Sequence, residues 1–176
     1  QTTKNIFALM FLLRGIPFVD LAYLRKADIQ GNTLKYRRRK TGRLLTVMLT
    51  PDAIKLIRIV AKTKPESPYL FPFLSSPEGT EAAYHEYQSS LRMFNYRLSR
   101  LKKYMKTAAH LSSYTIRHTW ATMAYYCEIH PGIISEAMGH SSIKVTETYL
   151  KPFQNEKIDN ANSQVISYVK EYASIV

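Results

Sequence analysis

Three side chains in the last third of the chain, Arg117, His140 and Tyr149, are of types that could carry chemistry on an anionic group. A guanidinium meets anionic oxygens with paired, charge-assisted hydrogen bonds. Tyrosine is a poor nucleophile at its free pKa of about 10, so it needs cationic groups around it in order to ionise. Arg117 lies at an expected helix start among apolar neighbours, where its charge must find an anion or bear the cost of desolvation.

Each of these side chains also has an ordinary structural interpretation. Arg117 could form a buried salt bridge with Glu128 or Glu136. His140 lies in a turn between two expected helices and could be a hydrogen-bonded structural histidine. Tyr149 is one of 13 tyrosines, which by default pack in the core or lie on the surface. Taken singly, none of the three patterns establishes a function.

The charge of the chain favours a polyanionic partner. The 176 residues include 25 Lys and Arg against 13 Asp and Glu, which gives a net charge of +12 and a pI near 9.8. Nucleic acid is better supported than a membrane surface, because no basic amphipathic helix with a bulky apolar face stands out. The alternative is a soluble basic domain with no such partner, and composition does not separate DNA from RNA.

Other features exclude several classes of protein. No run of eighteen apolar residues is present, and the first five residues lack the parts of a signal peptide. Cys127 is the only cysteine, so the chain forms no internal disulfide and no cysteine-based zinc site. We therefore expect a cytoplasmic protein that needs neither a metal nor a cofactor and does not act at a membrane.

The pattern of apolar and turn residues predicts a mixed α/β fold that is mainly helical, with a small three-stranded antiparallel sheet. Thr50 and Pro51 mark one helix start, as N-cap and first helical residue. The strands are expected at 27–29, 33–36 and 44–49, and the helices at 6–13, 18–24, 51–62, 83–105, 115–126, 131–138, 143–149 and 155–172. A proline-rich loop over 65–77 should bury residues 69–71.

The order of the motifs changes their interpretation. Arg117-His118-Thr119, then Gly139-His140, then Tyr149 resembles the C-terminal signature of the tyrosine recombinases, which include phage and transposon integrases and chromosome-dimer resolvases. Upstream, Arg39-Lys40-Thr41-Gly42-Arg43 resembles the hairpin that carries the family's lysine. The segment 18–24 resembles the one that follows the family's first arginine. The resemblance covers essentially the whole chain in the right order.

This resemblance implies a site-specific recombinase, specifically a mobile-element integrase, that cuts and rejoins DNA. Tyr149 would attack a DNA phosphate and form a 3′-phosphotyrosyl intermediate. Arg117 and His140 would stabilise the phosphate, and Lys40 would protonate the leaving 5′ oxygen. The family works without a metal or ATP.

The resemblance also implies a domain organisation and an assembly. Residues 1–176 would form the catalytic domain, with a tail helix over 155–176 and an N-terminal DNA-binding domain outside this chain. Enzymes of this family act as homo-tetramers on double-stranded DNA. The apolar residues of the tail could dock on a neighbouring protomer or pack on their own domain; they are Ile158, Val165, Ile166 and Val169.

The sequence departs from the family pattern at two positions. Tyr114 stands where the family usually has histidine, and a phenol can donate a hydrogen bond but is a poor base. Pro17 stands where the family has its first arginine. Arg14 lies about one helical turn earlier and is the expected substitute, with a structural ion pair to Asp20 as the alternative.

The remaining basic residues are expected to contact the DNA backbone. A solvated charge run is the alternative explanation for them. The predicted phosphate contacts are Arg37, Arg38, Arg39, Arg43, Arg97 and Arg100. Three other functions compete with the recombinase: a relative that binds DNA without cutting it, a type IB topoisomerase and, least favoured, an RNA-binding protein.

Overall fold

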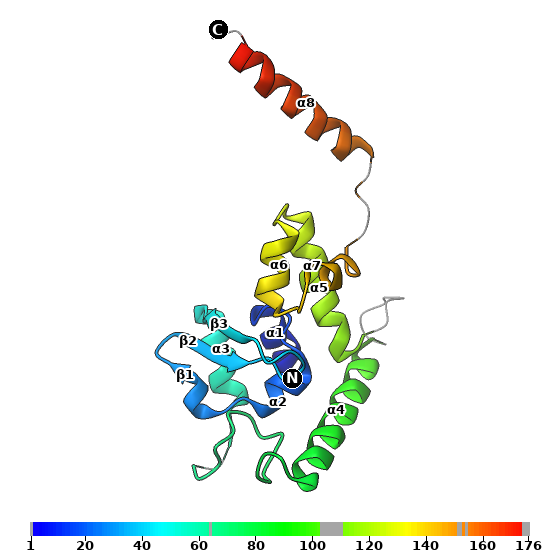
Figure 1. The fold of residues 1–176 in the computed structure, drawn as a ribbon. Helices are drawn as coiled ribbons and strands as arrows, with labels where there is room; N and C mark the ends of the chain where they lie inside the picture. The colour runs from blue at the N-terminus through cyan, green and yellow to red at the C-terminus, as the bar shows by residue number, and fades with distance from the viewer. Residues whose placement is uncertain (1, 64, 103–110, 151–152, 154, 174–176) are drawn as a thin grey trace.

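The computed structural model describes residues 2–63, 65–102, 111–150, 153 and 155–173. Its helices are α1 Thr2–Leu12, α2 Phe18–Tyr23, α3 Pro51–Val60, α4 Glu81–Lys102, α5 Ser113–Tyr126, α6 Pro131–Met138, α7 Ile143–Glu147 and α8 Asn155–Ala173 (Figure 1). Its strands are β1 Ile29–Gln30, β2 Thr33–Arg37 and β3 Leu44–Met48, which form an antiparallel sheet in the order β1-β2-β3. The predicted fold, mainly helical with one small antiparallel sheet, is confirmed.

The sheet buries one face because its side chains alternate. Leu34 and Tyr36 of β2 pair with Val47 and Leu45 of β3, and all four are buried, while the residues between them in β2 and β3 are mostly exposed. The hairpin between β2 and β3 closes through a hydrogen bond from the Arg38 backbone nitrogen to the Arg43 carbonyl, at 2.8 Å.

The first strand begins later than predicted. Residues 26–28 form a 3-10 turn, and β1 contains only Ile29 and Gln30. The carboxylate of Asp28 accepts a hydrogen bond from the Arg25 backbone nitrogen at 2.7 Å, and this local bond competes with extended strand geometry.

The main core lies between α1, α3, α4 and the sheet. Leu9 and Met10 of α1 are completely buried, as are Phe71 of the proline-rich loop and, nearly so, Leu98 of α4. The predicted burial of residues 69–71 is confirmed. The last predicted turn of α4, over 103–105, lies outside the described residues.

A second, smaller apolar cluster joins α5 to α6. It contains Ala121, Ile134 and Met138, with Trp120 and Tyr149 packed against it. The cluster fixes how α5 lies against α6 and the segment after α7. These are the elements that carry the three motifs.

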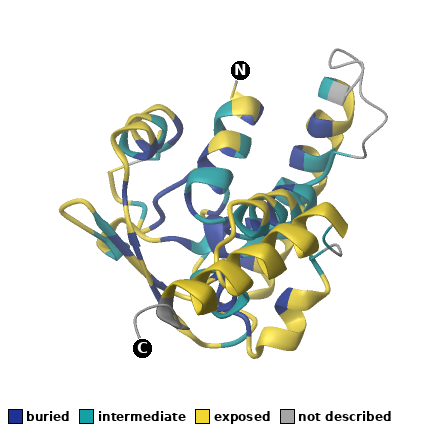
Figure 2. Ribbon diagram, turned by 90° about the horizontal axis from the view of Figure 1, so that it is seen from above, coloured by how far each residue is buried: buried dark blue, intermediate teal, exposed yellow. Residues whose placement is uncertain are grey.

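Helix α8 extends beyond α5 and α6 (Figure 1), and all of its described side chains are exposed (Figure 2). The apolar residues of the tail, Ile158, Val165, Ile166 and Val169, are therefore not packed on their own domain. The helix meets the body through an ion pair between Lys157 Nζ and Glu128 Oε1 at 3.1 Å. Among the described residues, no helix is long and apolar enough to cross a membrane.

Candidate active site

One cavity of about 260 Å³ brings five of the predicted catalytic residues together. Its walls come from the start of α2, the β2–β3 hairpin, α4, α5, the turn after α6, α7 and the segment that follows it. The predicted residues that line it are Lys40, Tyr114, Arg117, His140 and Tyr149. Lys40 and Tyr149 are 109 positions apart in the sequence, so the fold brings distant segments together.

Arg117 is held in the first turns of α5 and is only 3% exposed. The Ser112 hydroxyl caps this helix by accepting a hydrogen bond from the Thr115 backbone nitrogen at 3.3 Å. Arg117 Nη1 donates to the Gly15 carbonyl at 3.0 Å, and Nη2 donates to the Met138 carbonyl at 2.6 Å.

These contacts replace the salt bridge to a glutamate that was the ordinary interpretation of Arg117. A guanidinium has five N–H groups, so Arg117 has donors left for the Tyr149 side chain, with which it also interacts, and for an anion in the cavity. Burial, and then the positive charge of Arg38, lower the pKa of Arg117. The site is therefore short of negative charge.

His140 follows Gly139, whose φ of +66° closes α6 in the left-handed region. Its Nδ1 lies 2.8 Å from the Thr146 hydroxyl, while its Nε2 is buried without a hydrogen-bond partner among the described residues. Burial and the charges of Arg117, Arg38 and Lys40 lower the pKa of His140 to about 4. His140 is therefore neutral at pH 7, and its Nε2 has no hydrogen-bond partner among the described residues.

Tyr149 lies among three ring systems at the mouth of the cavity. Its hydroxyl is 2.7 Å from the Tyr114 hydroxyl, and its ring stacks on His140 with centroids 5.4 Å apart. His118, to which the sequence assigned no role, lies closer still, at 4.4 Å between centroids. The hydrogen bond to Tyr149, and then burial, raise the pKa of Tyr114, so Tyr114 keeps its proton at neutral pH.

Lys40 lies exposed in the β2–β3 hairpin, and the rest of that hairpin is tied to the turn after α6. The Thr41 hydroxyl donates to the Gly139 carbonyl at 3.1 Å, and Arg43 donates to the His140 carbonyl. The ammonium group of Lys40 has no hydrogen-bond partner among the described residues, while the hairpin around it is anchored by Thr41 and Arg43.

The structure does not bring Arg14 into this cavity. Arg14 lines a separate, larger cavity of about 980 Å³, together with Trp120 and residues of α6. The helix α1 ends at Leu12, one residue before the end predicted for it, and Arg14 and Gly15 both have φ near +60°. Arg14 therefore lies next to Trp120 of α5 in this second cavity, outside the one that holds Arg117.

The alternative for Arg14, an ion pair with Asp20, does not form either. Asp20 instead accepts hydrogen bonds from Arg38 Nη1 at 2.8 Å and from the Arg39 backbone nitrogen at 3.0 Å.

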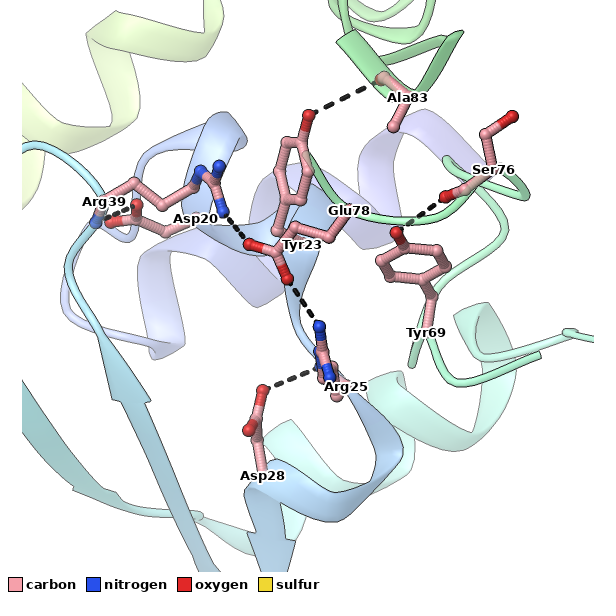
Figure 3. Close-up of polar contacts among 9 residues, drawn as sticks. All are labelled: Asp20, Tyr23, Arg25, Asp28, Arg39, Tyr69, Ser76, Glu78 and Ala83. Atoms are coloured by element: carbon pink, nitrogen blue, oxygen red, sulfur yellow. Dashed lines mark hydrogen bonds and ion pairs between the residues drawn. The ribbon is translucent and has the colours of Figure 1, made fainter. Parts of the chain in front are cut away.

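Most of the predicted phosphate contacts on the hairpin already have partners in the protein. Arg37 donates to the Gly42 carbonyl at 3.1 Å, while Arg43 is engaged as described above. The Arg39 guanidinium lies 3.8 Å from the ring centroid of Tyr23 and turns towards Glu78, which also binds Arg25 (Figure 3).

On α4, Arg97 and Arg100 are exposed and make no hydrogen bond within the described residues. They remain the predicted contacts best able to reach a phosphate.

Arg38 differs from the other predicted contacts because it is buried, with 7% of its surface exposed, and lines the catalytic cavity. The strand period gave a signal for this position: residues 34, 36 and 38 share one face, and the first two are apolar. Alternation along residues 35–39 predicts that one set of side chains reaches DNA while the other is solvated, and the burial of Arg38 matches neither expectation.

Within the described part of the chain, no group of three or more His, Cys, Asp or Glu side chains could hold a metal ion. The arrangement instead offers guanidinium, ammonium, imidazole and phenol groups around one small cavity. Such a set can bind a tetrahedral anion, stabilise added negative charge on it and present an oxygen nucleophile to it.

The chain is similar in fold to several solved structures. The XerA recombinase matches with a TM-score of 0.61 and 16% identity, over 93% of this chain and 62% of that chain. The Tn1549 transposon integrase in complex with transposon right end DNA matches with a TM-score of 0.63 and 16% identity, over 93% of this chain and 59% of that chain. A lambda integrase dimer bound to a COC′ core site matches with a TM-score of 0.57 and 16% identity, over 84% and 51%.

This chain thus spans less than two thirds of the length of these proteins. No curated protein matches it. Residues 2–156 match the sequence model of the phage integrase family. Because that match covers most of the chain, the chain belongs to the phage integrase family.

Proposed function

We propose that this chain is the catalytic domain of a site-specific tyrosine recombinase that integrates a mobile element into double-stranded DNA. The observation that carries the proposal is the placement of Tyr149 at a cavity lined by Arg117, Lys40 and His140. A nucleophile, two cations and a neutral imidazole with a free nitrogen are the groups that transfer of a phosphodiester requires.

The chemistry needs no bound cofactor. Tyr149 Oη attacks phosphorus while the bond from phosphorus to the 5′ oxygen breaks, which leaves a 3′-phosphotyrosyl link. The phenolic proton passes to water, because neutral His140 is too weakly basic to hold it. Lys40 gives a proton to the departing 5′ oxygen. A 5′ hydroxyl of the partner strand then reverses the step, so the bond energy is kept without ATP.

Tyr114 acts as a hydrogen-bond donor in this scheme. Its hydroxyl lies 2.7 Å from that of Tyr149 and keeps its proton at neutral pH. A phenol that donates to the attacking oxygen stabilises the ionised form of Tyr149 without becoming charged. The residue thereby supports the nucleophile, where the histidine usual at this position would contact phosphate.

The assembly proposed is a homo-tetramer on DNA, to which α8 contributes. Four apolar side chains of α8 are exposed, which suits a helix that packs against a neighbouring protomer. The lambda integrase structure is of a dimer on DNA, which supports assembly on the DNA.

A covalent-capture assay tests the reaction. Nicked duplexes with a randomised central sequence are incubated with the protein, and DNA that stays attached in SDS is recovered and sequenced. We expect Tyr149→Phe to remove the attached DNA while folding and DNA binding persist, because only the attacking oxygen is lost. Tyr126→Phe, on an exposed tyrosine of α5, is the matched control and should leave the yield unchanged.

Two outcomes contradict the proposal in different ways. Attached DNA with Tyr149→Phe shows that another residue is the nucleophile. Tight DNA binding with no attached DNA in the wild-type protein identifies a relative that binds DNA without cutting it.

A further inference from the structure

The cavity that holds Tyr149 is lined by one more cationic side chain than the two that have a role in the proposed function, Arg117 and Lys40. Arg38, Lys40 and Arg117 all line it, and none of the described residues lining it is acidic. Arg38 and Arg117 are both buried, and the charge of Arg38 lowers the pKa of Arg117, so the two guanidinium groups lie close enough to repel. Two buried cations side by side call for an anion between them.

Asp20 does not fill this requirement, because it lies behind Arg38. Its carboxylate is completely buried and accepts from Arg38 Nη1 at 2.8 Å and from the Arg39 backbone nitrogen at 3.0 Å. Figure 3 shows this carboxylate facing the Arg39 backbone where the hairpin begins. The pair fixes the plane of the Arg38 guanidinium and leaves Asp20 outside the lining of the cavity.

One edge of the Arg38 guanidinium remains unused. Nη1 is bonded to Asp20, while Nε is buried without a hydrogen-bond partner in the described part of the chain. No hydrogen bond forms at Nη2 within that part either. Nε and Nη2 together make the side-on fork that meets two oxygens of a phosphate. A buried, unpaired donor of this kind is costly unless a ligand satisfies it.

Arg38 lines the same cavity as Pro17, the position at which the chain lacks the family's first arginine. Pro17, at the place of the family's first arginine, lines the same cavity and cannot supply a guanidinium. Asp20, three residues later on the same short helix, is the residue that holds Arg38. Arg38 is therefore anchored over the segment where an arginine is missing, whereas Arg14 lines another cavity.

We propose that Arg38 is the second catalytic arginine of this enzyme: its Nε–Nη2 edge binds the non-bridging oxygens of the scissile phosphate opposite Arg117, with Asp20 as the positioning residue. This assignment rests on the proposed function. It replaces the phosphate-tracking role predicted for Arg38 and the catalytic role predicted for Arg14. Lys40 lies two residues further along the same hairpin, so one segment supplies both the phosphate-binding guanidinium of Arg38 and the general acid.

The test compares two substrates that differ by one charge. The DNA recovered by covalent capture is made once as the natural phosphodiester and once with an uncharged methylphosphonate at the cleavage position. Single-turnover rates of attachment are measured for the wild type and for Arg38→Gln. We expect Arg38→Gln to lose roughly 10²–10³-fold on the phosphodiester, as for the loss of one preorganised donor. Relative to the wild type, most of that loss should disappear on the methylphosphonate, which carries no charge to neutralise.

Three further variants control for folding and for position. Arg38→Gln leaves Asp20 buried without its partner, so the double variant Arg38→Gln/Asp20→Asn removes both charges at nearly constant volume and should show the same substrate dependence. Lys35→Gln, on the exposed face of β2, removes a neighbouring positive charge and should cleave like the wild type. Arg14→Gln tests the rival arginine directly.

The outcomes separate the assignment from the function on which it rests. Unimpaired cleavage by Arg38→Gln, or an equal loss on both substrates, overturns the assignment while leaving the recombinase intact. A substrate-dependent loss at Arg14 in place of Arg38 overturns it as well. If the wild-type protein attaches to neither DNA, the proposed function fails, and the role of Arg38 fails with it.

Discussion

His140 is a neutral residue in a ring of cations, and its hydrogen bonds decide what it can do there. The Thr146 hydroxyl lies 2.8 Å from Nδ1 and can donate to it. With Thr146 as the donor, the ring proton is on Nε2, the buried nitrogen without a partner among the described residues. A neutral imidazole of this tautomer adds a hydrogen-bond donor for phosphate without adding to the repulsion between the cations.

The depressed pKa of His140 predicts a pH dependence of stability. The folded state holds this pKa at about 4, while an unfolded histidine has about 6.5, so between these values the unfolded chain binds the extra proton. The contribution of His140 is therefore complete above pH 6.5 and is lost as the pH falls towards 4, by up to about 3 kcal/mol. Urea titrations across this range should show the free energy of unfolding of the wild type falling relative to that of His140→Gln. Parallel profiles for the two proteins would contradict the neutral, buried imidazole.

Motif spacing was sufficient to find the residues that come from short, ordered patterns, and insufficient for those that depend on packing. Arg117, His140 and Tyr149 lie in local motifs, so the sequence located them and the fold brought them together. Arg14, the expected catalytic arginine, lines another cavity, whereas Arg38, expected to track phosphates, lines the one with Tyr149 and is held by the buried carboxylate of Asp20. No pattern of residue types predicts the left-handed turn at Arg14, whereas the alternation along β2 does indicate burial at position 38.

At the scale of elements, the site depends on how closely α5 approaches the end of α1. Gly15 has φ of +65°, and a Cβ atom there would lie 3.0 Å from the Arg117 Cα and 3.2 Å from the Trp120 Cβ. The glycine is thus required twice, for its backbone conformation and for the contact between the two helices. The hydrogen bond from Arg117 to the Gly15 carbonyl depends on that approach.

Two glycine substitutions separate these requirements. Gly31→Ala adds a methyl group at φ of +58° with nothing within 4 Å, so it should cost about 1 kcal/mol from the backbone alone. Gly15→Ala has the same backbone penalty together with overlap against α5, and should cost about 2 kcal/mol or more. Free energies of unfolding from urea titration measure both. Equal losses in the free energy of unfolding would show that the contact between α1 and α5 adjusts to the added methyl group at little cost.

The elements were predicted more completely than their ends. Apolar periodicity located the α-helices of the described chain, including α8, whose described side chains are all exposed. The boundaries of β1 and α1 moved because local hydrogen bonds at Asp28 and the turn at Arg14 decide them. Such bonds depend on geometry of a few residues that periodicity does not capture.

At the scale of the whole molecule, the net charge of +12 is only partly matched by acidic partners within the protein, and the proposed function assigns the remainder to DNA. The hairpin arginines at 37, 39 and 43 are engaged within the protein. Arg97 and Arg100 on α4 are exposed and make no hydrogen bond within the described residues. The long helix is therefore expected to supply more of the backbone contacts than the hairpin does.

Salt dependence of binding measures this division. The logarithm of the affinity for duplex DNA should fall linearly with the logarithm of the salt concentration, by about 0.9 for each phosphate neutralised. Replacing both Arg97 and Arg100 by Gln should reduce the slope by roughly 1.8. The matched control replaces Lys55 and Arg58, two exposed basic residues of α3, and should leave the slope unchanged. A wild-type slope near zero would exclude DNA as the main partner.

The two hydrogen bonds of Arg117 bear on how such a domain changes over evolutionary time. Its guanidinium joins the carbonyls that end α1 and α6, so its loss would leave two buried acceptors unpaired. Lys40 makes no comparable link among the described residues, and replacing Tyr149 by Phe would remove its hydroxyl while its ring still packs against the α5–α6 cluster. In a lineage that drifts from cutting DNA to binding it, selection for folding alone would retain the arginine. An intact tyrosine and an intact lysine are therefore better evidence of a catalytically active recombinase than an intact Arg117.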